Sequence, residues 1–183
     1  MGNKKGALDL SVGTIVIIVL AMSMLILGLV LVRSIFTGAT YNVNTINDNV
    51  KAEINKLFNE RGEKTVLYLP NNEAKVKKGE SFGIAFSVQN NVKGEAGDSN
   101  FAYKVDATSV QTGCQLSLQE ANSYIILNKE GNFNLAPGQQ LNPPRIIKVQ
   151  PSEAAPLCLI NYDIEVTRNG QHYATNFFIL VIE

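Results

Sequence analysis

A long uncharged stretch near the start of the chain constrains what the rest can fold into. Residues 10–32 contain no charged side chain, Lys4 and Lys5 lie just before them, and Arg33 follows them. A helix rises about 1.5 Å per residue, so this stretch would span roughly 34 Å, enough to cross a hydrocarbon layer of about 30 Å. A helix buried in a soluble core would normally keep a polar face, and this stretch has none. The pattern therefore predicts a transmembrane helix.

The two lysines also predict an orientation. By the positive-inside rule they keep the short N-terminal tail in the cytoplasm and place the C-terminal part outside the cell. A secretory signal peptide fits less well, because its apolar part is usually about 7–15 residues long. We expect a single-pass protein of the cell membrane with an extracellular C-terminal domain, or an extracellular filament, and the lipid bilayer is then a partner. The expected parts are a basic leader (1–6), a transmembrane helix (7–36), an amphipathic stalk helix (37–62) and a β-sandwich (63–183).

The stalk is predicted from apolar residues that recur at helical spacing. They follow one another three or four positions apart, and polar residues fill the other face: Val43, Ile46, Val50, Ile54 and Leu57. Gly62 lies just past the last turn, where glycine often ends a helix. This apolar stripe packs either on the β domain of its own chain or against helices of other copies.

The remaining residues read as short strands separated by turns. In residues 82–88, large apolar side chains alternate with small ones, which is the period of a strand with one clear apolar face. Near the C-terminus, Asn169-Gly170 is a favoured two-residue hairpin turn, because both positions need a positive φ. Residues 177–182 are apolar on both faces, which predicts a central strand whose outer face is covered by the stalk helix or by another copy.

We therefore predict an α+β fold, in which a long N-terminal transmembrane and stalk helix leads into an all-β, antiparallel sandwich of immunoglobulin-like architecture. Seven to nine short strands with Gly, Pro and Asn between them are typical of such a sandwich. The tryptophan found in the core of true immunoglobulin domains is absent from this chain.

Two cysteines, Cys114 and Cys158, lie in or beside strand-like segments. An oxidising location would permit a disulfide, and closing a loop of this length stabilises by roughly 4 kcal/mol on the entropy model. The alternative is a pair of buried free thiols.

Little in the sequence indicates catalysis, and we predict that the protein is not an enzyme. His172 is the single histidine and follows the hairpin turn, where a solvated strand residue is expected. Walker A, zinc-protease and EF-hand patterns are all absent. Two cysteines and one histidine without a ligand spacing predict neither a metal site nor a cofactor. A formal net charge of zero gives no basic surface for nucleic acid.

The N-terminus resembles a known family. Lys4-Lys5-Gly6-Ala7, followed by a long apolar helix, is similar to the class III signal peptide of type IV pilin-like proteins. Residues 12–17 also resemble the start of archaeal pilin and archaellin helices. The resemblance implies cleavage after Gly6 by a membrane prepilin-type peptidase, a retained helix and a β-sandwich head. Bacterial pilins usually carry Glu five residues after the cut, where this chain has Ser11.

Two functions follow as expectations. The first is a non-enzymatic, cell-surface structural protein, a pilin-like subunit of an extracellular filament that forms a homo-oligomer through the N-terminal helix. The second is a membrane-anchored, immunoglobulin-like binding or adhesion module. Small side chains that would let helices approach closely, and apolar ones that would pack the stalk, are the expected helix-packing residues: Gly13, Ala21, Gly28, Ile46, Val50, Ile54 and Leu57.

Overall fold

The computed structural model describes the chain except residues 1–3, 38–47, 93, 95 and 96, and it leaves the side chains of residues 4–12, 30–37 and 61 undescribed. The chain divides into two compact units, Met1–Thr40 and Tyr41–Glu183. Within the described residues, the first unit holds one long helix, and the second holds two α-helices, a short 3-10 helix and the β-strands.

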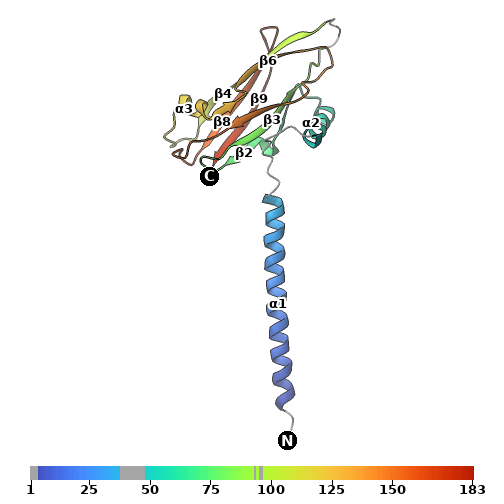
Figure 1. Ribbon diagram of the computed structural model, residues 1–183, viewed down its shortest axis with the longest axis vertical. Coiled ribbons are helices and arrows are strands. Elements are labelled where there is room, and N and C mark those ends of the chain that lie inside the picture. Colours follow the sequence, from blue (N-terminus) through green and yellow to red (C-terminus); the bar gives the residue numbers. More distant parts are fainter. Residues whose placement is uncertain (1–3, 38–47, 93, 95–96) are drawn as a thin grey trace. The chain divides into compact units, whose positions relative to one another are not determined.

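Helix α1 runs without interruption over Lys4–Thr37 (Figure 1). Among the described residues, however, no helix combines the length and the apolar character that crossing a membrane requires. The part of α1 whose side chains are described, residues 13–29, rises roughly 25 Å, less than the hydrocarbon layer of about 30 Å. For the described structure, the predicted transmembrane helix is therefore wrong. The single-pass localisation, the extracellular placement and the α+β fold class led by such a helix are corrected with it.

The second unit consists of two packed sheets, a sandwich-like arrangement (Figure 1). Strands in the first sheet lie in the order β1-β3-β7-β5, and those in the second lie in the order β2-β9-β8-β4-β6. The bounds of the first four are β1 (Thr65–Tyr68), β3 (Phe82–Val88), β7 (Arg145–Val149) and β5 (Ile125–Leu127). Those of the second sheet are β2 (Glu73–Val76), β9 (Gln171–Ile182), β8 (Leu159–Arg168), β4 (Ser99–Val110) and β6 (Glu130–Leu135).

The sheets are not wholly antiparallel, which differs from the expected sandwich. Strand β2 runs parallel to β9, with Glu73 opposite Ile179 and Val76 opposite Ile182. The parallel pair arises because β1 and β2 follow each other in one direction, separated by a short 3-10 turn at Pro70–Asn72. At this turn the chain leaves the first sheet and joins the second.

The main core lies between the two sheets and follows the alternation of the strands. On β8, Ile160, Tyr162, Ile164 and Val166 are fully buried, and the residues between them lie on the outer face. The predicted turn of the β8–β9 hairpin is confirmed: Asn169 has φ 49° and Gly170 has φ 79°.

Helix α2 (Asp48–Arg61) covers the outer face of the first sheet (Figure 1). Its buried side chains form a second cluster with Val66 of β1 and Ala85 of β3: Val50, Ile54 and Phe58. The stripe thus packs on its own domain. It lies on the sheet opposite to the one that contains β9, so the expectation that this helix covers the outer face of residues 177–182 is wrong.

A short helix, α3 (Leu118–Ser123), was not expected, since the sequence around Leu118 reads as a strand. It begins with a capping box: the Ser117 hydroxyl accepts a hydrogen bond from the Glu120 N–H at 3.1 Å, and the Glu120 carboxylate accepts from the Ser117 N–H at 3.4 Å. These bonds satisfy donors that would otherwise lack partners at the first turn.

Candidate functional site

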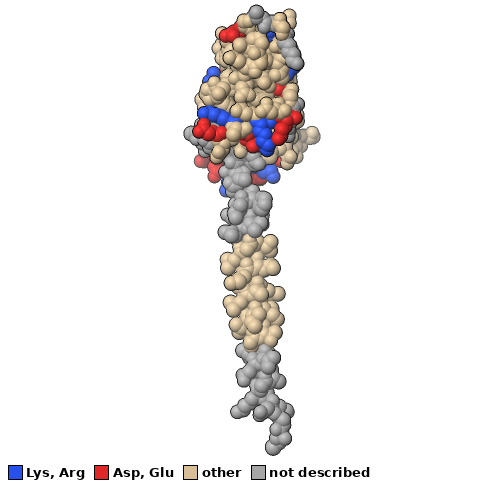
Figure 2. Space-filling view, turned by 90° about the vertical axis from the view of Figure 1, so that its right-hand side faces the viewer, with Lys and Arg blue, Asp and Glu red and all other residues tan. Residues whose placement is uncertain are grey.

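The described surface of α1 is apolar on every side. All twelve large apolar side chains between residues 15 and 29 are exposed, and the exposed fraction of each lies between 50% at Ile18 and 75% at Met24. Successive helix residues are about 100° apart, and a set as dense as this one therefore encircles the helix. Figure 2 shows the described part of this helix without a charged side chain.

The few polar groups in this stretch do not interrupt the apolar surface. The Ser23 hydroxyl donates to the Leu20 carbonyl at 2.8 Å, so its hydrogen-bonding capacity is met inside the helix. The three small residues predicted to pack against other helices, Gly13, Ala21 and Gly28, are exposed. A Cβ added at either glycine would meet nothing within 4 Å.

The other predicted packing residues lie in or before α2. Val50 and Ile54 are buried against the first sheet, and Leu57 packs beside them, half-buried. These three side chains are occupied within their own domain, whereas Ile46 lies outside the described residues.

The predicted processing segment lies at the start of the chain. Lys4, Lys5, Gly6 and Ala7 fall in the first turns of α1, and their side chains are not among those described. Cleavage after Gly6 therefore stays a prediction.

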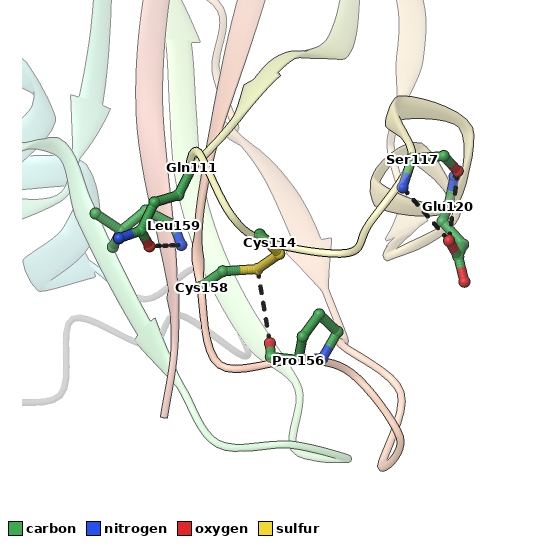
Figure 3. The surroundings of a disulfide bond; sticks show 7 residues. All are labelled: Gln111, Cys114, Ser117, Glu120, Pro156, Cys158 and Leu159. Atoms are coloured by element: carbon green, nitrogen blue, oxygen red, sulfur yellow. Dashed lines mark hydrogen bonds between the residues drawn. A yellow bond between two sulfur atoms is a disulfide. The ribbon is translucent and has the colours of Figure 1, made fainter.

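Cys114 and Cys158 form a disulfide that braces one end of the second sheet (Figure 3). Their Cα atoms are 6.0 Å apart, across 44 residues of sequence. The bond joins the loop after β4 to the residue that precedes β8, where these neighbouring strands would otherwise separate. Gln111 adds to the brace, because its N–H donates to the Leu159 carbonyl at 2.9 Å and its side chain accepts from the Leu159 N–H at 3.2 Å.

Several titratable groups lie on the sandwich. Within the described residues, no three His, Cys, Asp or Glu side chains are close enough together to hold a metal ion. His172 is exposed and lies 3.3 Å from the Thr175 hydroxyl. Burial raises the pKa of Tyr162, whose hydroxyl donates to the Ala121 carbonyl at 2.6 Å. A hydrogen bond to Asp106 raises the pKa of Lys104 on the outer face of β4.

Comparison with known proteins gives no family. No family model matches the chain, and no curated protein matches it. Among solved structures it is similar to a family 123 glycoside hydrolase from Clostridium perfringens, with 15% identity and a TM-score of 0.45 over 71% of this chain. The likeness spans 25% of that enzyme.

Two further structures show weaker likeness. The PapD-like domain 7 of human CEP192 has 12% identity and a TM-score of 0.37, over 66% of this chain and 84% of that domain. The alkylpurine DNA glycosylase AlkC of Pseudomonas fluorescens has 14% identity and a TM-score of 0.29, over 64% of this chain and 30% of that one. At these scores the likenesses carry no argument about function.

Proposed function

We propose that this protein is a non-enzymatic structural subunit that assembles into a filament through α1, which packs against the same helix of other copies. The observation that carries the proposal is the unbroken ring of exposed apolar side chains on α1. Soluble proteins rarely leave an apolar surface of this extent uncovered, and a helix that is apolar all round is normally buried.

The distribution of these side chains favours several neighbours over one. A helix that pairs with a single partner needs an apolar seam on one side, whereas α1 is apolar on all sides. Burying the exposed parts of its large apolar side chains would contribute on the order of 1 kcal/mol each before the entropy cost of association. Other copies of the chain supply identical helices. If each copy binds the next through the same pair of surfaces, and the rotation between neighbours does not close a ring, the copies form an open filament.

In such an assembly, the sandwich would lie on the surface of the filament. It has a core of its own between the two sheets, a helix packed on its outer face and a disulfide at one end. Those features stabilise the domain from within.

Substitution of Leu25 in α1 tests the proposal. Leu25 is 64% exposed in the single chain, and Leu25→Lys would place a charge inside the helical core of the assembly, at a cost of several kcal/mol. We expect sedimentation of the full chain to show large assemblies for the natural protein and for Leu25→Met, and a shift to small species for Leu25→Lys. If Leu25→Lys assembles as the natural chain does, α1 is not the assembly surface.

A further inference from the structure

Strand β6 forms one edge of the second sheet. In the described part of the chain, the other three edge strands of the two sheets are shorter: β1 and β2 have four residues each, and β5 has three. β6 has six residues, and its register with β4 is regular from one end to the other. Natural sheet edges are usually protected by brevity, a bulge, proline or lysine. The sequence of β6 contains neither proline nor lysine, so this edge has none of these protections.

The backbone directions in β4 show which groups of β6 face outward. The Asn100 N–H donates to the Asn169 side chain at 2.9 Å, and the Asn100 carbonyl accepts from the Asn169 N–H at 2.7 Å, so the backbone of Asn100 points toward β8. The Val105 N–H points the other way and donates to the Lys129 carbonyl at 2.8 Å. Because the direction of these groups alternates along a strand, the odd-numbered residues from 99 to 105 bond to the β6 side.

The same alternation applies to β6. Gly131 lies opposite Tyr103 and therefore exchanges its backbone hydrogen bonds with β4. The residues on either side of it, and the second one after it, direct their N–H and C=O groups away from β4: Glu130, Asn132 and Asn134. Among the described residues, none bonds to these outward backbone groups. The edge thus presents three residues whose backbone can pair with a further strand.

Two copies of β6 are complementary to each other when they run antiparallel about Asn132. In that register Asn132 faces Asn132 of the second copy and Glu130 faces Asn134, so all three outward residues form hydrogen-bonded pairs. The two Glu130 carboxylates lie about 13 Å apart along the strands, and no like charges face each other. On the inner face, the half-buried ring of Phe133 comes opposite Gly131, which has no side chain to obstruct it. An aromatic ring across from an edge glycine is a favourable pair.

We propose that two copies of this chain pair edge to edge through β6, about a two-fold axis that passes between the two strands at Asn132. The second sheet of one sandwich then continues into that of the other. A two-fold contact places the same surface on both partners, so the surface must match itself. Binding a strand of a different protein would not require β6 to match itself, and this match therefore favours a second copy. The contact is separate from assembly through α1, and neither requires the other.

Disulfide trapping in the full chain tests the pairing and its register. The Cα atoms of a hydrogen-bonded antiparallel pair lie about 5.5 Å apart, within the roughly 4.4–6.8 Å that a disulfide spans. Asn132→Cys would place two thiols at the two-fold axis, and we expect a disulfide-linked dimer under mild oxidation. Asn134→Cys is the matched control, because Asn134 is exposed on the same face of β6 but would lie about 13 Å from its copy. The native cysteines are already paired with each other.

Two substitutions at Asn132 separate backbone pairing from side-chain contact. Both are made together with Leu25→Lys in mild detergent, so that α1 does not bring the sandwiches together. Asn132→Pro removes the outward N–H of each copy, and proline is tolerated at a sheet edge, whereas Asn132→Thr keeps that N–H. By sedimentation equilibrium we expect the dimer to dissociate about tenfold more readily in Asn132→Pro, which loses two hydrogen bonds, and within about twofold of the parent in Asn132→Thr. Circular dichroism checks that both variants remain folded.

Three results would overturn the proposal. The first is no trapped dimer in Asn132→Cys, or equal amounts in Asn132→Cys and Asn134→Cys. The second is an unchanged dissociation constant in Asn132→Pro. The third is slow hydrogen exchange at the Asn132 and Asn134 amides at every protein concentration, because this would show that another segment of the same chain covers β6. Assembly through α1 is read from Leu25→Lys alone, so loss of the β6 contact leaves the proposed function standing.

Discussion

Truncation of Ile54 tests whether α2 is an integral part of the sandwich. Ile54 is 1% exposed and packs in the cluster between α2 and the first sheet. Ile54→Ala removes three carbon atoms, which at about 0.8 kcal/mol each amounts to roughly 2.4 kcal/mol of lost burial. The cavity left behind adds to this, so we expect a loss of about 3 kcal/mol in the free energy of unfolding.

Urea unfolding followed by far-ultraviolet circular dichroism measures this loss, and thermal unfolding should show a midpoint lowered by about 10 °C. Asn59→Ala is the matched control, because Asn59 is exposed on the same helix, and a change within about 0.5 kcal/mol is expected there. A loss below 1 kcal/mol for Ile54→Ala, or equal losses for both variants, would refute the packing of α2 on the sheet.

Three further predictions concern the sandwich. Replacing both Cys114 and Cys158 with serine should lower the free energy of unfolding by up to about 4 kcal/mol in denaturant titration; an unchanged midpoint would contradict the bracing role. The raised pKa of buried Tyr162 means that the unfolded state ionises first, so stability should fall as pH rises above about 10. Tyr162→Phe should reduce that slope, and an identical slope in both proteins would refute this origin. Ser117→Ala should cost about 1 kcal/mol through loss of the cap on α3, measured against the exposed control Ser152→Ala, and equal effects would contradict the capping role.

Much of the sandwich could be predicted because its signals are local. The turn at Asn169-Gly170 follows from the backbone conformation that those two residues tolerate, and the strand at residues 82–88 follows from simple alternation. The stripe on α2 was visible as helical spacing, although the sequence did not show that the helix would pack on β1 and β3. From the sequence alone, the two cysteines could form a disulfide or remain buried free thiols. The structure shows the disulfide.

Other features depend on signals that are short or non-local. Strand β2 contains four residues, and its parallel pairing with β9 is set by the turn at Pro70–Asn72 rather than by its own pattern. Helix α3 was missed although Ser117 and Glu120 have the spacing of a capping box, because the neighbouring apolar residues favoured a strand.

The prediction of a membrane span shows a different limit. Length and the absence of charge across residues 10–32 indicate an apolar helix, yet they do not distinguish lipid from other helices as its surroundings. No membrane-crossing helix is found among the described residues. The apolar surface of α1 remains, and we assign it to contacts between copies of the chain.

Crosslinking between copies of α1 tests that assignment most directly. Single cysteines introduced by Met22→Cys and Met24→Cys lie about 200° apart around the helix, and the native cysteines are already paired. A short bis-maleimide should link chains of the assembled protein efficiently at both positions, and much less at an exposed sandwich position, Asp98→Cys. Absence of crosslinks at both helix positions in assembled material would contradict the packing of α1 against other copies.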